Sequence, residues 1–223
     1  MANHGWLPRS GKDIDLAKLQ HAVVGAYNYA PDSFDGAFQQ ALDLNVTTTG
    51  NRLTFHLSDL AKHDAVEFDG SLSRNDFFFG DTLHFNPAIW GTVAHNLGLN
   101  DKKSGKYVTV ETAAKARAAR VRDAMRVNPT FNASANQMQG SPGTTALYLT
   151  TLWDDKADGA QKSWIKSFFG RFCNCLRLCN DADYSTVDER LPYAEGYKVR
   201  EVQRGNSSIF AIFERIQAVK VET

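Results

Sequence analysis

The chain has 223 residues, and its 25 Lys and Arg balance 25 Asp and Glu, so it carries no formal net charge at neutral pH. A balanced chain has no overall field that would hold nucleic acid or an anionic membrane, and no stretch approaches the roughly 18 apolar residues of a membrane-spanning helix. The length suits one domain with a substantial core, and no linker rich in Pro, Gly or Ser divides it. We therefore expect a single domain over residues 1–223 that binds neither nucleic acid nor membrane.

The first third of the chain predicts two helices with helically spaced apolar residues. The first covers about residues 16–27 and follows the capping candidates Asp13 and Asp15. The second follows Asp32 or Ser33, with an apolar face that includes Ala37, and Pro31 separates the two helices. A short helix is expected at 57–63, and residues 52–56 are one of the few strand candidates.

Five further helices are expected along the rest of the chain. Asn86 and Pro87 supply a cap and a first-turn proline for a helix that ends at Gly98. The longest covers 109–126, with Met125 on its buried side, and another begins at Ser141 and Pro142. The last two cover about 163–169 and the segment after residue 206, where Phe210 belongs to the predicted buried stripe. The chain therefore predicts an all-α fold with little or no sheet.

The helix at 109–126 also carries a row of basic residues, namely Lys115, Arg117, Arg120, Arg122 and Arg126. Such a row is typical of a solvated helix face. An RNA-binding face is the alternative, but it lacks interleaved aromatic residues for base stacking. An anionic ligand for one of the arginines is a further alternative.

All three cysteines, Cys173, Cys175 and Cys179, lie within seven residues. A zinc site needs a fourth ligand and paired spacing, and this segment offers neither. The pattern favours reduced cysteines that behave as small apolar residues.

The octapeptide EFDGSLSR at residues 67–74 gathers two carboxylates, two hydroxyls and a guanidinium around one glycine. Glu67 and Ser71 are four positions apart, and Gly70 permits a sharp turn between them, so their oxygens can converge on a hard divalent cation. An anion such as phosphate is the alternative ligand, and a solvated loop is the interpretation without function.

Together with ANHGWLPR at residues 2–9 and ERLPY at 189–193, the octapeptide resembles the fungal haem-thiolate peroxidases, the family of chloroperoxidases and unspecific peroxygenases. The resemblance spans nearly the whole chain and implies a compact multi-helix domain. It also implies haem b and Mg²⁺ as cofactors, with Glu67, the backbone carbonyl of Phe68 and Ser71 as magnesium ligands. A small apolar or aromatic compound is the implied substrate. The axial cysteine of the family belongs to a Pro-Cys-Pro motif that would precede Met1.

Two internal positions depart from the family pattern. Phe68 stands where short members carry histidine, and a phenyl ring cannot relay a proton. Thr144, in GTTALYL at 143–149, stands where the family has its distal glutamate, and a hydroxyl is a poor general base. The chain is therefore either a peroxidase-type oxidoreductase or a haem-free relative that binds or cyclises a small apolar metabolite.

Three expectations complete the sequence analysis. Residues 170–186 have no counterpart in the family pattern and read as an insertion or a retained intron. The aromatic residues Phe77, Phe78 and Phe79 read as core, or as the wall of an apolar substrate pocket. The chain as it stands lacks a signal peptide and would remain in the cytosol, whereas a longer chain would be secreted. We expect a monomer or homodimer.

Overall fold

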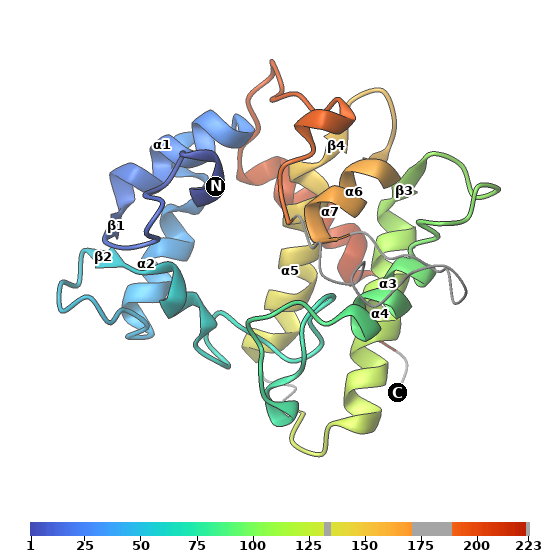
Figure 1. Ribbon diagram of the computed structural model, residues 1–223, viewed down its shortest axis with the longest axis horizontal. Coiled ribbons are helices and arrows are strands. Elements are labelled where there is room, and N and C mark those ends of the chain that lie inside the picture. The colour runs from blue at the N-terminus through green and yellow to red at the C-terminus, as the bar shows by residue number, and fades with distance from the viewer. Residues whose placement is uncertain (132–134, 171–188, 222–223) are drawn as a thin grey trace, which may run out of the picture. The chain divides into compact units, whose positions relative to one another are not determined.

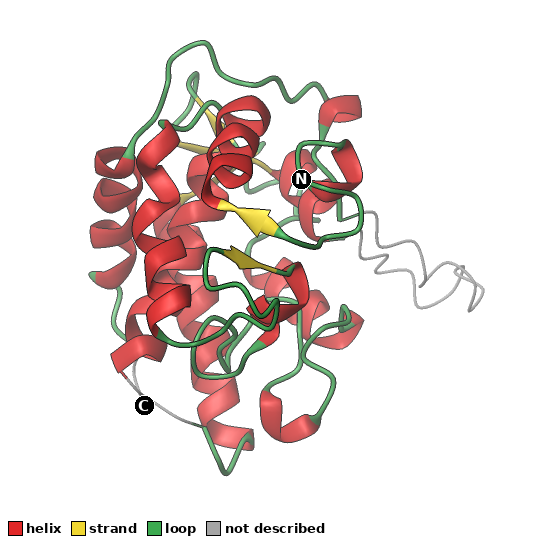
Figure 2. Ribbon diagram, turned by 90° about the vertical axis from the view of Figure 1, so that its left-hand side faces the viewer, coloured by secondary structure: helices red, strands yellow, loops and turns green. Residues whose placement is uncertain are grey.

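The computed structural model describes residues 1–131, 135–170 and 189–221, with residues 135–140 described by their backbone alone. Helices dominate the described chain, and the strands are few and short (Figure 2). The prediction of a mostly helical fold is confirmed, and two small sheets accompany the helices. None of the helices in the described ranges has the length and apolarity to cross a bilayer.

The chain separates into two compact units (Figure 1). Unit 1 comprises Met1–Phe68 and Lys198–Phe210, and unit 2 comprises Asp69–Tyr197 and Ala211–Thr223. The boundary between Phe68 and Asp69 falls inside the octapeptide, and the second boundary falls inside helix α7 (Asn206–Gln217). The organisation as one domain stays a prediction.

Unit 1 contains helices α1 (Leu16–Tyr27) and α2 (Asp35–Asp43), together with the strands β1 (Ile14–Asp15) and β2 (Thr54–Phe55). The Asp15 carboxylate caps α1 by accepting a hydrogen bond of 2.8 Å from the Lys18 amide, as its place in the sequence predicts. A 3-10 turn, Pro31–Phe34, separates the two helices. The strands pair antiparallel and bring Ile14 opposite Phe55 in the core.

Unit 2 contains four of the predicted helices, and α4 and α5 are its longest elements. The four are α3 (Pro87–Asn96), α4 (Val110–Val127), α5 (Ala135–Thr151) and α6 (Lys162–Phe169). Its sheet has the antiparallel order β3 (Tyr107–Thr109), β5 (Gly159–Gln161), β4 (Trp153–Asp154). Gly159 lies so close to β3 that an added Cβ would be 2.2 Å from the Val108 carbonyl oxygen. The backbone contact therefore requires glycine at this position.

An aromatic cluster forms part of the core of unit 2. Trp90 on α3 is fully buried, and its ring stacks on Phe169 with the centroids 4.8 Å apart. Its indole N–H donates to the Gly170 carbonyl at 2.9 Å, which satisfies the polar end of a buried side chain. The Tyr148 ring meets Phe169 edge-on. These contacts join α3, α5 and α6.

Four expectations about the helices are wrong. Helix α5 begins at Ala135 rather than at residue 141, so Pro142 lies inside it and costs one backbone hydrogen bond that packing must offset. Met125 and Phe210 are exposed, as is Ala37. The buried positions near the end of α7 are Ile212 and Ile216, and Phe210 is turned about 200° around the axis from Ile212. The expectations for the three cysteines fall outside the described residues, as do those for the insertion beyond Gly170.

Candidate functional site

The last six residues of the octapeptide belong to a closed loop in unit 2, which we call the acidic loop (residues 69–77). Two carboxylates close it: the Gly70 amide donates to Asp76 Oδ1 at 2.9 Å, and the Phe77 amide donates to Asp69 Oδ1 at 2.8 Å. Gly70 has φ +81°, a backbone conformation that side chains disfavour. The glycine therefore permits the turn that the sequence predicts.

Helix α4 holds this loop from two sides. Arg120 pairs with Asp76 Oδ1 at 2.5 Å and donates through Nε to the Ser71 carbonyl at 2.9 Å. Directly after the helix, at its C-cap, the Asn128 side-chain amide donates to Asp69 Oδ2 at 3.0 Å. Asp76 is 1% exposed and Arg120 is 6% exposed. Because both partners are buried, the ion pair is screened far less than a surface pair.

The burial of Arg120 contradicts the prediction of a solvated basic face, and Arg117 is buried as well. Lys115, Arg122 and Arg126 are exposed, as predicted. The two buried arginines lie between two buried alanines at helical spacing, along the stripe 113, 117, 120 and 124. The alanines at both ends of this stripe were the sequence signal that it faces inward.

The predicted magnesium ligands are divided between the units, since Glu67 and Phe68 belong to unit 1 and Ser71 to unit 2. Glu67 Oε2 lies 2.6 Å from His63 Nδ1. The Ser71 carbonyl faces the Arg120 guanidinium. No group of three or more His, Cys, Asp or Glu side chains suited to a metal occurs in the described part of the chain. This finding does not test the predicted magnesium ligands, because Glu67 is the one such side chain among them. The magnesium site stays a prediction.

Thr144 lies on an exposed part of α5, and its hydroxyl donates to the Ser141 carbonyl of the same helix at 3.0 Å. Helix α5 contains no Asp, Glu or His anywhere along its length. The Ser141 hydroxyl accepts a hydrogen bond of 2.9 Å from Arg117 Nε on α4. This part of unit 2 therefore offers hydrogen-bond donors but no general base from α5.

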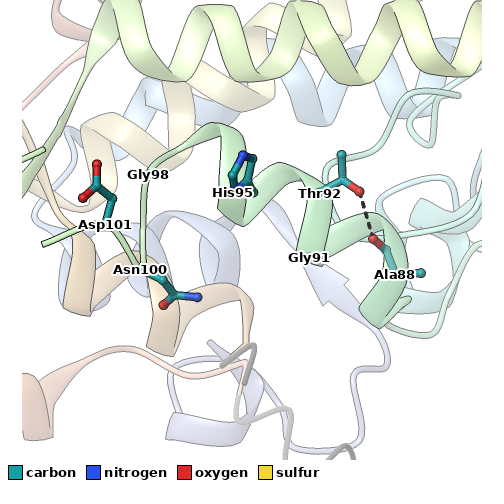
Figure 3. Close-up of a pocket in the computed structure, with 7 residues that line it drawn as sticks. All are labelled: Ala88, Gly91, Thr92, His95, Gly98, Asn100 and Asp101. Carbon is teal, nitrogen blue, oxygen red and sulfur yellow. Dashed lines mark hydrogen bonds between the residues drawn. The ribbon is translucent and has the colours of Figure 1, made fainter. Parts of the chain in front are cut away.

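A pocket of about 690 Å³ lies along one side of α3, from Ala88 in its first turn to the turn that follows the helix (Figure 3). The Thr92 hydroxyl in its wall donates to the Ala88 carbonyl, and His95 and Asp101 are also part of the lining. None of the predicted site residues lines this pocket. It is therefore a different place from the acidic loop.

The aromatic run that begins at the last residue of the acidic loop is on the surface, contrary to the core interpretation. Phe77, Phe78 and Phe79 are 58%, 50% and 48% exposed, and Leu83 is 59% exposed. Phe78 and Phe79 meet edge-on. The alternative interpretation, the wall of a substrate pocket, stays a prediction.

Residues 1–202 match the sequence model of the family described as peroxidase, family 2. The chain belongs to this family. It is 27% identical to an aromatic peroxygenase from Coprinellus radians over 150 residues, covering 59% of this chain and 55% of that protein. It is also 27% identical to an aromatic peroxygenase from Cyclocybe aegerita over 188 residues, covering 76% of this chain and 49% of that protein. The chain spans about half the length of these relatives.

Haem-thiolate chemistry requires a sulfur donor to iron, and the described residues do not fit that requirement because none of them is a cysteine. The cysteines at 173, 175 and 179 lie outside the described residues. A thiolate upstream of Met1 stays a prediction.

Proposed function

We propose that this family 2 peroxidase is an oxidoreductase that uses peroxide to oxidise small apolar or aromatic compounds. The observation that carries the proposal is the acidic loop, in which four buried side chains hold a segment that resembles the family motif. The family match supports it, and so do the two relatives named aromatic peroxygenases. The substrate class rests on those names.

In this proposal, as the family resemblance implies, Glu67, the Phe68 carbonyl and the Ser71 hydroxyl would hold Mg²⁺. Haem b would supply the oxidising chemistry once its sulfur donor is present. Arg120 and Asp76 fix the Ser71 end of the site, because Arg120 binds the Ser71 carbonyl while Asp76 binds both Arg120 and the Gly70 amide. The chain's own residues therefore contribute positioning.

Proton transfer is the weak step in this proposal. Thr144 replaces an acid, and its hydroxyl is bonded to its own helix. Loss of general acid–base catalysis costs about 10²–10⁴-fold in rate. We therefore expect slow turnover in the natural chain, and Thr144→Glu should recover a large part of that factor. Thr92→Glu introduces the same group at an exposed threonine on α3 and serves as the matched control.

The test begins with protein expressed from the reading frame extended upstream of Met1 and supplied with haem. A red-shifted Soret band of the ferrous–CO complex and peroxide-dependent oxidation of benzyl alcohol are the expected results. Activity that rises in Thr144→Glu but not in Thr92→Glu would support the proton-transfer argument. Absence of both haem uptake and oxidation in the extended protein contradicts the proposal.

A haem-free relative that binds or cyclises a small apolar metabolite is the second candidate. Phe68 and Thr144 favour it, because both changes leave fewer groups that move protons, and α5 supplies no replacement acid. Stoichiometric haem uptake with peroxide turnover would exclude this candidate.

A further inference from the structure

Among the residues that the structure describes, Arg117 is a buried cation without a carboxylate partner. Only 4% of the residue is exposed, and its Nε donates to the Ser141 hydroxyl at 2.9 Å. The two terminal nitrogens make no hydrogen bond within the described ranges, and neither is among the fully enclosed polar atoms that lack a partner. The small exposed part of the residue is all that a ligand from solvent can reach.

The surroundings of Arg117 do not neutralise it. One helical turn further along α4, Arg120 already uses Asp76 as its partner, so that pair is electrically balanced. The α4 positions one turn away on the other side are Ala113 and Ala114, and α5 has no acidic residue. A guanidinium remains charged in proteins, and burial lowers the pKa of Arg117.

Enclosing a charge without a counter-charge is costly, and Ser141 compensates for it with a single neutral acceptor. Two N–H groups on the planar guanidinium fit the two oxygens of a carboxylate. The local excess is one positive charge, which a monoanion balances. A phosphate dianion would need donors beyond the ones described here.

From this geometry we infer that Arg117, oriented by Ser141, binds the carboxylate group of a small aromatic acid. The carboxylate follows from Arg117 itself, whereas the aromatic part rests on the proposed function. The bound acid lies beside the turn of α5 that carries Thr144, because Ser141 begins that turn and accepts the Thr144 hydrogen bond through its carbonyl. The site requires neither haem nor magnesium.

Calorimetric titration of the purified chain with sodium benzoate at low salt tests the site, with benzamide as the neutral ligand of the same shape. We expect benzoate to bind the natural chain more tightly than benzamide. Loss of a charge-assisted pair is expected to weaken benzoate about 10- to 100-fold in Arg117→Gln. Arg122→Gln removes the same charge from an exposed position of the same helix and should leave benzoate affinity unchanged.

Several results would overturn the inference. Equal affinity for benzoate and benzamide in the natural chain would do so, as would equal loss of benzoate affinity in Arg117→Gln and Arg122→Gln. If Arg117→Gln does not fold by circular dichroism, Ser141→Ala provides the second variant, since it keeps the cation but removes its orienting acceptor. We expect about 2- to 10-fold weaker benzoate binding there, and unchanged binding would contradict the inference.

A carboxylate can also come from a haem propionate, and competition separates the two sources. If haem displaces benzoate while haem dimethyl ester does not, the propionate occupies the site. If neither displaces benzoate, the occupant is the organic acid. The titration contains no peroxide and measures no turnover, so a failed titration leaves the proposed oxidation untouched, and an inactive enzyme leaves the carboxylate site untouched.

Discussion

Replacement of Arg120 by methionine should destabilise unit 2 strongly, because it removes one partner of a buried ion pair. Asp76 would keep a 1% exposed carboxylate with only the Gly70 amide as donor, since its Oδ2 has no partner among the described residues. Removing one side of a buried pair costs about 3–5 kcal/mol. With a urea m-value of about 2–3 kcal/mol per M, the midpoint falls by about 1–2.5 M.

Urea unfolding followed by tryptophan fluorescence is the appropriate measurement, since Trp90, Trp153 and Trp164 all belong to unit 2. The control is Arg126→Met on the same helix. Arg126 pairs with Asp123 at 3.6 Å, and the two side chains are 73% and 46% exposed, so its loss should cost at most about 0.5 kcal/mol. If Arg120→Met and Arg126→Met lower stability by similar small amounts, the acidic loop does not depend on the buried pair as described.

Three further predictions concern other parts of the chain. Hydrogen bonds from Arg190 lower the pKa of Glu195 to about 2 from 4.5. The natural chain should therefore be more stable than Arg190→Met above pH 4.5, and this difference should disappear as the pH falls toward 2. Acid titration of both proteins by circular dichroism checks the sign. Gly25→Ala should lower the melting temperature despite better helix propensity, because the new Cβ would lie 2.2 Å from the Trp6 ring; overpacking of this kind costs about 1–3 kcal/mol, and an unchanged melting temperature would refute it. Asn86→Ala should cost about 1 kcal/mol by removing the cap of α3, whereas Asn86→Asp should retain most of it, as thermal unfolding would show.

Sequence patterns located the helices well where local chemistry decides the outcome. Asn86 with Pro87 marks the start of α3 in both sequence and structure, because a cap and a first-turn proline act within a few residues. The start of α5 was wrong because Pro142 reads locally as a helix start, whereas the helix continues through it. The helix propensity of a single residue carries no information on the tertiary packing that keeps Pro142 inside α5.

The candidate site was predictable in part. The sharp turn at Gly70 and the importance of the octapeptide could be read from neighbouring residues. The partners of the acidic loop could not, because Arg120 and Asn128 lie 44 and 59 residues from the aspartates that they bind. A row of basic residues on a helix indicates solvent exposure on average, and the local sign against it for Arg117 and Arg120 is the alanine one turn away from each, at positions 113 and 124.

The same sequence separations have a kinetic consequence. Contacts that close long stretches of chain form late, since the entropy of closure must be lost before they contribute. The segment around Gly70 should therefore acquire its final shape only after α4 has formed and docked, and a growing polypeptide would expose Asp69 and Asp76 to water until then. Any ligand that depends on this shape would be captured after the helical part of unit 2 has folded.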